Sequence, residues 1–181
     1  MRNQRNTAEG WCLIHQLIRC IVYAKNKQTA ITQARSNLQE LTSSGEPYDY
    51  FVTFEEDEPT NGVAGKDRFG DRPPAVEADS EKGQELVEEG WESQKEAYEK
   101  ALEKIENFFE STDDAMDIVE TTQDGLIRHQ MMKLGRYRGY PVFFYDHYCS
   151  GLTTRDDLDS ALEAPNSENQ KIWIVPADVH F

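Results

Sequence analysis

The residues best suited to chemistry are histidines that have an acidic or thiol side chain close by in the sequence. Asp146, His147 and Cys149 follow a hydrophobic stretch, and Asp178 precedes His180 at the C-terminal end of the chain. A cysteine–histidine pair can act as nucleophile and base, and a carboxylate–histidine pair can transfer protons, provided that the side chains face each other. The simpler interpretations are a polar turn and a terminal strand. A small hydrolase with a site near Asp146 and His147 is therefore one alternative hypothesis.

A second group, Cys12, His15 and Cys20, contains residue types that bind metals. Its spacing, C-x2-H-x4-C, matches no standard zinc arrangement and lacks a fourth ligand. Cys20 lies in an apolar stretch, which is typical of a small core residue. The sequence also lacks the glycine-rich phosphate loops and the HExxH, GxSxG and CxxC signatures of common enzymes. We therefore expect no metal and no cofactor.

The strongest candidate for a binding surface is the basic and aromatic segment 133–140, KLGRYRGY. In an extended chain Arg136 and Arg138 share one face, while neighbouring tyrosines add aromatic surface. Arginine with tyrosine suits a protein-binding hot spot, or phosphate contact combined with base stacking. The competing interpretation is that these arginines pair with the protein's own carboxylates. The candidate binding residues are Arg128, Lys133, Arg136, Tyr137, Arg138 and Tyr140.

The distribution of charge singles out the same region. The 181 residues carry 34 acidic and 19 basic side chains, for a net charge of −15. Residues 10–39 and 126–145 contain eight basic and no acidic residues, so the remaining 131 residues carry −23. Dense carboxylates suit a protein that works in high salt, and they disfavour general nucleic-acid binding. A mimic of nucleic-acid phosphates is the other explanation of the acidic excess. We expect function at the acid-free windows, unless burial alone explains why they contain no acid.

Composition indicates a folded cytoplasmic protein. Hydrophobic residues make up 38% of the chain, too many for a disordered protein, and no apolar run reaches the ~18 residues of a membrane span. Three cysteines fit a reducing compartment better than a disulfide framework. Residues 11–24 resemble a signal peptide only weakly, because polar residues interrupt them and no cleavage site follows. We expect a cytoplasmic location and no membrane partner.

Hydrophobic periodicity predicts the elements that would position these residues. The expected strands are 13–24, 48–54, 126–138, 141–146 and 171–181, and the expected helices are 27–42, 80–109, 113–121 and 154–162. Segment 126–138 also fits helical spacing, and we favour a strand slightly. Gly90 suggests a break in helix 80–109, and Pro176 suggests a strand end or an edge strand. Thr154 with Asp157 has the form of a capping box.

Together these elements predict one α/β domain, residues 11–181, after a loose tail at 1–10 and with a long surface loop at 55–78. We expect an α+β fold, a two-layer α/β sandwich of the ferredoxin-like kind. It would have four to five mixed or antiparallel strands, with helices 27–42 and 80–109 on one face.

Four segments taken together resemble a family of small uncharacterised proteins from salt-loving archaea and their mobile elements. They are HQLIRCIVYA, AVEADSEKGQELVEEGW, GRYRGYPVFFYD followed by LTTRDDLDSAL, and IWIVPADVHF. The resemblance spans most of residues 13–181 and implies a halophilic cytoplasm. It implies no activity and no site residues.

The leading hypothesis is a non-catalytic interaction or accessory protein of a halophilic cytoplasm that meets a protein partner through residues 128–138. The first alternative is a nucleic-acid-associated protein of a mobile element that uses the basic and aromatic segment 133–140. The hydrolase near Asp146 and His147 is the second alternative. The sequence does not determine the oligomeric state.

Overall fold

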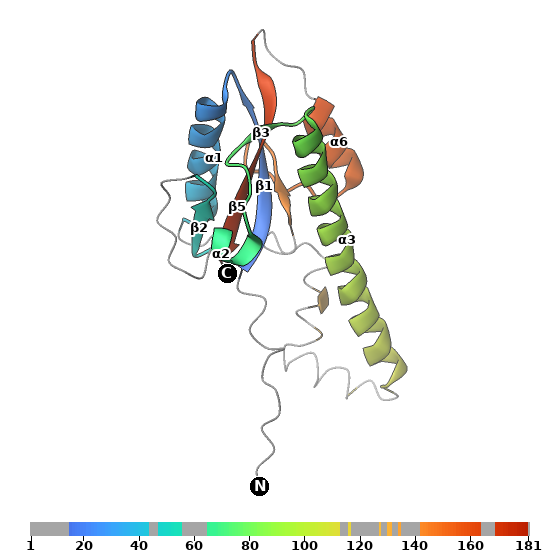
Figure 1. Ribbon diagram of the computed structural model, residues 1–181. Coiled ribbons are helices and arrows are strands. Elements are labelled where there is room, and N and C mark those ends of the chain that lie inside the picture. Colours follow the sequence, from blue (N-terminus) through green and yellow to red (C-terminus); the bar gives the residue numbers. More distant parts are fainter. Residues whose placement is uncertain are drawn as a thin grey trace.

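The computed structural model describes residues 15–43, 47–55, 65–112, 116, 127, 130–131, 134, 142–163 and 169–180. The core is a mixed sheet of five strands (Figure 1): β1 (His15–Ala24), β2 (Tyr50–Thr53), β3 (Val76–Glu77), β4 (Phe144–Tyr145) and β5 (Lys171–His180). The helices with described bounds are α1 (Lys27–Leu41), α2 (Lys66–Phe69), α3 (Glu81–Glu110) and α6 (Arg155–Glu163).

The two long strands, β1 and β5, form the centre of the sheet. The strand order is β2-β5-β1-β4, and β3 also pairs with β5. β5 is antiparallel to β1, β2 and β3, whereas β4 is parallel to β1. β1 and β2 therefore run in the same direction with β5 between them, and α1 connects them. The mixed α/β character and the number of strands agree with the sequence-based prediction.

Pro176 lies within β5 rather than at its end. Its partner in β1 is Arg19, whose backbone N–H points away from β5 to the carbonyl of Phe143 at 2.9 Å. The two residues thus form a non-hydrogen-bonded pair, so the proline nitrogen faces the other side of β5. That side is open at this point, because β2 ends opposite Ala177 and β3 begins opposite Ile174. The missing N–H therefore removes no ladder hydrogen bond, and the position is locally an edge, as the sequence suggested.

One face of the sheet packs against α1. Asn26 caps this helix by accepting a hydrogen bond from the backbone N–H of Thr29 at 3.0 Å. The buried stripe of α1 contacts alternate residues of β1 and β5, including Cys20 and Val175. The stripe is the one that helical spacing predicted: Ala30, Ile31, Ala34, Leu38 and Leu41.

The opposite face packs against α3 and α6. Ile21 and Ile174 lie in one cluster with Leu86 of α3 and Leu158 of α6. Figure 1 shows α1 on one side of the sheet and α3 with α6 on the other. The prediction that helices 27–42 and 80–109 share one face is therefore wrong, and the two-layer ferredoxin-like arrangement is not confirmed. The physical reason is that β1 is buried on both faces, so both need a covering layer.

α3 runs without a break through Gly90, against the sequence-based suggestion. A Cβ at this position would come within 2.6 Å of the Phe144 ring and 2.7 Å of the Arg19 side chain. The glycine therefore lets the helix approach the sheet closely, which explains why a helix-weakening residue is found there. Beyond this contact, the C-terminal half of α3 extends past the sheet (Figure 1).

The remaining predictions have mixed outcomes. In segment 126–138 the described residues Ile127, Gln130, Met131 and Leu134 are helical, so the slight preference for a strand is wrong for them. Of the predicted helix 113–121 only Met116 is described, and it is helical.

The capping box of α6 is confirmed, because the side chains of Thr154 and Asp157 each accept the other's backbone N–H at 3.1 Å. The described part of the predicted loop 55–78 contains α2 and β3. The predicted tail 1–10 lies outside the described residues.

Candidate active site

The register of β1, β5 and β2 gathers polar side chains at one end of the sheet. His15 pairs with His180, Leu17 pairs with Asp178, and Tyr50 of β2 pairs with His180 on its other side. Since side chains alternate along strands, His15, Asp178, His180 and Tyr50 project from the face that packs against α3. Two histidines, a carboxylate and a phenol from three strands therefore meet at one place, called here the His15 site.

Asp178 holds the ring of His15 in one orientation. The His15 Nδ1 lies 3.0 and 3.1 Å from the two carboxylate oxygens, and the backbone N–H of Gly65 donates to the same carboxylate at 2.8 Å. The side chains of Asp178 and His15 are 1% and 8% exposed. Because an ionised carboxylate can only accept, Nδ1 carries the proton and Nε2 is left for other chemistry.

The second ring nitrogen of His15 contacts an exposed residue. Its Nε2 lies 3.4 Å from the hydroxyl of Tyr50, whose side chain is an exposed aromatic on β2. This long contact puts a polar hydrogen at the position where a water or substrate hydroxyl would give up its proton. Hydrogen bonds of this kind are often loose in a protein without substrate. The arrangement suits a general base.

His180 forms a second carboxylate–histidine pair beside the first. Its Nδ1 lies 3.2 Å from the carboxylate of Asp49, its ring stacks on Tyr50 at 4.6 Å, and its edge meets His15 at 5.0 Å between ring centroids. His180 and Asp49 are 22% and 69% exposed, so this pair is far more hydrated than the pair of His15 and Asp178. The site thus combines a buried imidazole, His15, with a more exposed one, His180.

Among the described residues, the two histidines have neither a serine or cysteine nor a lysine or arginine as a hydrogen-bonding partner. No described lysine or arginine forms an ion pair with Asp178 or Asp49. Across the same residues no group of three or more histidine, cysteine or acidic side chains could hold a metal ion. The chemistry that these groups can supply is proton transfer.

Asp146 and His147, by contrast, are turn residues at the other end of β1. The Nδ1 of His147 accepts the backbone N–H of Tyr23 at 3.3 Å, and the two rings stack at 5.0 Å. One carboxylate oxygen of Asp146 accepts the backbone N–H groups of Tyr148 and Ser150 at 2.9 and 2.8 Å. These contacts are those of a polar turn, and they give no support to a catalytic pair.

Cys149 belongs to the same turn and is a poor nucleophile. Its Sγ lies 3.8 Å from the carbonyl of Asn37 and 3.6 Å from the carboxylate of Glu40. Burial raises the pKa of the Cys149 thiol to about 11, and the charge of Glu40 acts in the same direction. The thiolate, which is the reactive form, is therefore scarce near neutral pH.

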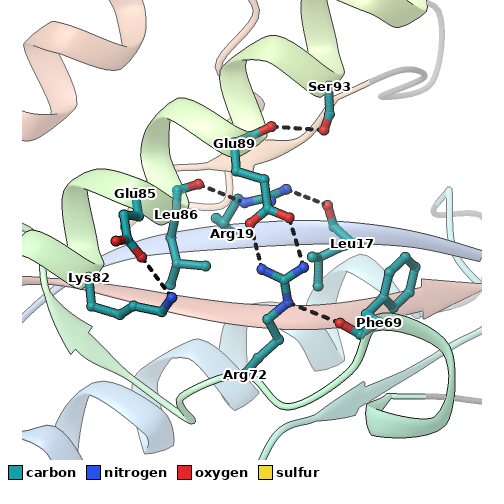
Figure 2. A network of polar contacts seen from close by, with 9 residues as sticks. All are labelled: Leu17, Arg19, Phe69, Arg72, Lys82, Glu85, Leu86, Glu89 and Ser93. Atoms are coloured by element: carbon teal, nitrogen blue, oxygen red, sulfur yellow. Dashed lines mark hydrogen bonds and ion pairs between the residues drawn. The ribbon is translucent and has the colours of Figure 1, made fainter.

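Between the two ends lies a second charged residue that is as deeply buried as Asp178, namely Arg19 (Figure 2). Its Nε donates to the carbonyl of Leu86 at 3.0 Å, its Nη1 donates to the carbonyl of Leu17 at 2.9 Å, and its Nη2 lies 3.4 Å from Glu89. Burial lowers the pKa of Arg19 to about 10, against the opposing effect of the Glu89 charge. These contacts join β1 to α3.

Glu89 also receives a bidentate ion pair from Arg72, at 2.6 and 2.7 Å, and the Nε of Arg72 donates to the carbonyl of Phe69 at 3.1 Å (Figure 2). All three nitrogens of each guanidinium have a protein partner. The network is therefore a structural clamp that fastens the segment after α2 to α3.

The predicted binding surface lies outside the described residues. This holds for each of its members: Arg128, Lys133, Arg136, Tyr137, Arg138 and Tyr140. The described part of the other acid-free window, residues 10–39, forms β1 and most of α1. Burial explains the absence of acids in β1, whereas the outer face of α1 is exposed and also contains none up to residue 39. Arg35, in that window, pairs with Glu55 at 2.8 Å.

The structure also tests part of the interpretation of Cys12, His15 and Cys20 as metal ligands. His15 and Cys20 stand at odd and even positions of β1 and so point to opposite faces of the sheet. Cys12 lies outside the described residues.

The partnership of His15 with Asp178 was not among the sequence-based predictions. The alternation of Asp178 and His180 in one strand was a usable signal, because it places both side chains on one face. The two partners, however, are 163 positions apart, and only the pairing register of β1 with β5 brings them together.

The chain belongs to a family described as a domain of unknown function, DUF7995, which matches residues 14–181. The resemblance to an uncharacterised family is thus confirmed, while the haloarchaeal origin stays a prediction. No curated protein and no solved structure matches the chain. Among the helices of the described part, none is both long and apolar enough to cross a membrane.

Proposed function

For this member of DUF7995, we propose that the protein is a hydrolase in which His15 activates a water molecule as a general base. One observation carries the proposal. The buried carboxylate of Asp178 accepts Nδ1–H of His15 at 3.0 Å, so that Nε2, whose partner is the hydroxyl of the exposed Tyr50 at 3.4 Å, is the nitrogen that can accept a proton. Imidazole exchanges protons near neutral pH and is the commonest general base in enzymes.

The charges around the site favour an uncharged substrate. Asp178 and Asp49 both lie at the site, and no described cation pairs with either of them. An anionic substrate would therefore meet like charge, whereas a carboxylic ester would not. Asp178 acts as a positioning residue, because it fixes the ring orientation without touching the reacting atoms.

The test is hydrolysis of p-nitrophenyl acetate by the full chain and by the variant His15→Gln. Loss of a general base lowers rates by roughly 10²–10⁴-fold, so we expect kcat/KM to fall by at least about 100-fold. The matched control is His147→Gln, which removes a histidine from the other end of β1 and should leave the rate unchanged. Circular dichroism confirms that both variants fold. Equal rates for the full chain and His15→Gln would overturn the proposal.

The interaction and nucleic-acid hypotheses remain predictions. Both depend on residues 128–140, whose candidate binding residues lie outside the described part of the chain, so no contact described above supports either. A halophilic cytoplasm also remains a proposal, supported by the net charge of −15.

A further inference from the structure

We propose that His180 is the general acid of the His15 site, so that two imidazoles act together on an uncharged carboxylic ester. The inference rests on the proposed function and assigns a second catalytic residue to it. His180 is the nearest ring to His15 on β5, with 5.0 Å between the centroids and 73° between the ring planes.

The two histidine rings are oriented alike relative to their carboxylates. The Nδ1 of His15 faces Asp178, and the Nδ1 of His180 faces Asp49. Each carboxylate takes one Nδ1, and the Nε2 of His15 has the Tyr50 hydroxyl as its partner at 3.4 Å, so a substrate reaches that nitrogen by displacing the hydroxyl. A substrate that reaches both Nε2 atoms meets a proton acceptor and a proton donor, which is what hydrolysis of an ester requires.

The two rings have different roles in the proposed reaction. His15 accepts a proton at Nε2, whereas His180 must carry a proton on both ring nitrogens in order to donate one from Nε2. The remaining groups that face the rings are Tyr50, Asp49 and Asp178, which are one phenol and two carboxylates. The competent form has the proton on His180.

The reaction then balances without any further reagent. Nε2 of His15 takes a proton from water as the water oxygen bonds to the acyl carbon. The bond between the acyl carbon and the leaving oxygen breaks, and that oxygen takes the proton from Nε2 of His180. The products are a carboxylic acid and an alcohol. Exchange with solvent returns the proton from His15 to His180.

The test compares two esters that differ in how much the leaving group needs a proton. The leaving phenolate of p-nitrophenyl acetate is stable without one, whereas the alkoxide of benzyl acetate is not. For His180→Gln we expect kcat/KM to fall about 100-fold with benzyl acetate and less than about 3-fold with p-nitrophenyl acetate. His147→Gln, the control, should leave both rates unchanged.

A second variant tests whether a folding defect near the chain end, rather than loss of the general acid, lowers the rate. Asp49→Asn keeps His180 but weakens its orientation, and it should show the same selective loss with benzyl acetate, to a smaller degree. If His180→Gln lowers both rates equally or neither, or if the full chain does not hydrolyse benzyl acetate, His180 is not the general acid. The proposed function would still stand as long as His15→Gln abolishes turnover of p-nitrophenyl acetate. Absence of any His15-dependent turnover would overturn both.

Discussion

The two ends of β1 carry similar side chains, but their histidines form hydrogen bonds in opposite ways. At one end His15 lies beside Asp178 and Tyr50, and at the other His147 lies beside Tyr23 and follows Asp146. His15 uses Nδ1–H on a carboxylate and keeps the lone pair of Nε2. His147 uses the lone pair of Nδ1 on a backbone N–H, so its neutral ring keeps only the donor Nε2–H. The difference shows that the partner of each ring nitrogen matters more than the types of residue nearby.

The carboxylates differ in the same way. Asp178 is buried and turned toward an imidazole, whereas one oxygen of Asp146 is occupied by two backbone N–H groups of its own turn. One carboxylate orients a ring and the other shapes the backbone. A sequence motif of neighbouring Asp and His fits both cases equally well.

The largest effect is expected from removing one negative charge at each end of β1 without changing the size of the side chain. In Asp178→Asn the amide group can donate to Nδ1 of His15, which favours the tautomer that has its proton on Nε2 and no free base. We expect kcat/KM for p-nitrophenyl acetate to fall about 1,000-fold, within the range that general-base loss produces.

Asp146→Asn is the matched control. An asparagine oxygen can still accept the backbone N–H groups of Tyr148 and Ser150, so the rate should change less than about 2-fold. Similar rates for the two variants would mean that Asp178 does not position a base.

The second prediction concerns Cys149, which lies two residues after His147. Its thiol pKa is raised from 9.0 to about 11 by burial and by Glu40. The shift of about two pKa units lowers the thiolate fraction about 100-fold at pH 8. We therefore expect iodoacetamide to alkylate the Cys149 peptide about 100-fold more slowly in the folded protein than in guanidinium chloride, as measured by mass spectrometry. Rates within about 5-fold of each other would show a reactive thiol and contradict the structural interpretation of this end.

Local sequence signals predicted where α1 and α6 begin. Asn26 marks the start of α1, and Thr154 with Asp157 marks the start of α6, because each cap satisfies backbone donors within a few residues. The apolar stripe of α1 followed from helical periodicity alone. Such features depend on neighbours in the sequence and need no knowledge of the fold.

The arrangement of these elements depended on contacts that are distant in the sequence. Every residue from Leu17 to Val22 is buried, so β1 shows no alternation that would reveal that helices cover both faces. The parallel pairing of β4 with β1, and the contact between His15 and Asp178, likewise follow only from the order of strands. The site was missed for the same reason as the layer arrangement.

The smallest effect tests whether His147 has only a structural role. In His147→Ala the backbone N–H of Tyr23 loses its acceptor at 3.3 Å and the Tyr23 ring loses its stacking partner. We expect the free energy of unfolding to fall by about 1–2 kcal/mol in urea titrations, because an unpaired amide and a lost aromatic contact each contribute on this scale. Hydrolysis of p-nitrophenyl acetate by the folded variant should stay unchanged. If the rate falls as far as in His15→Gln while stability is retained, His147 takes part in catalysis and the two ends of β1 do not differ in function.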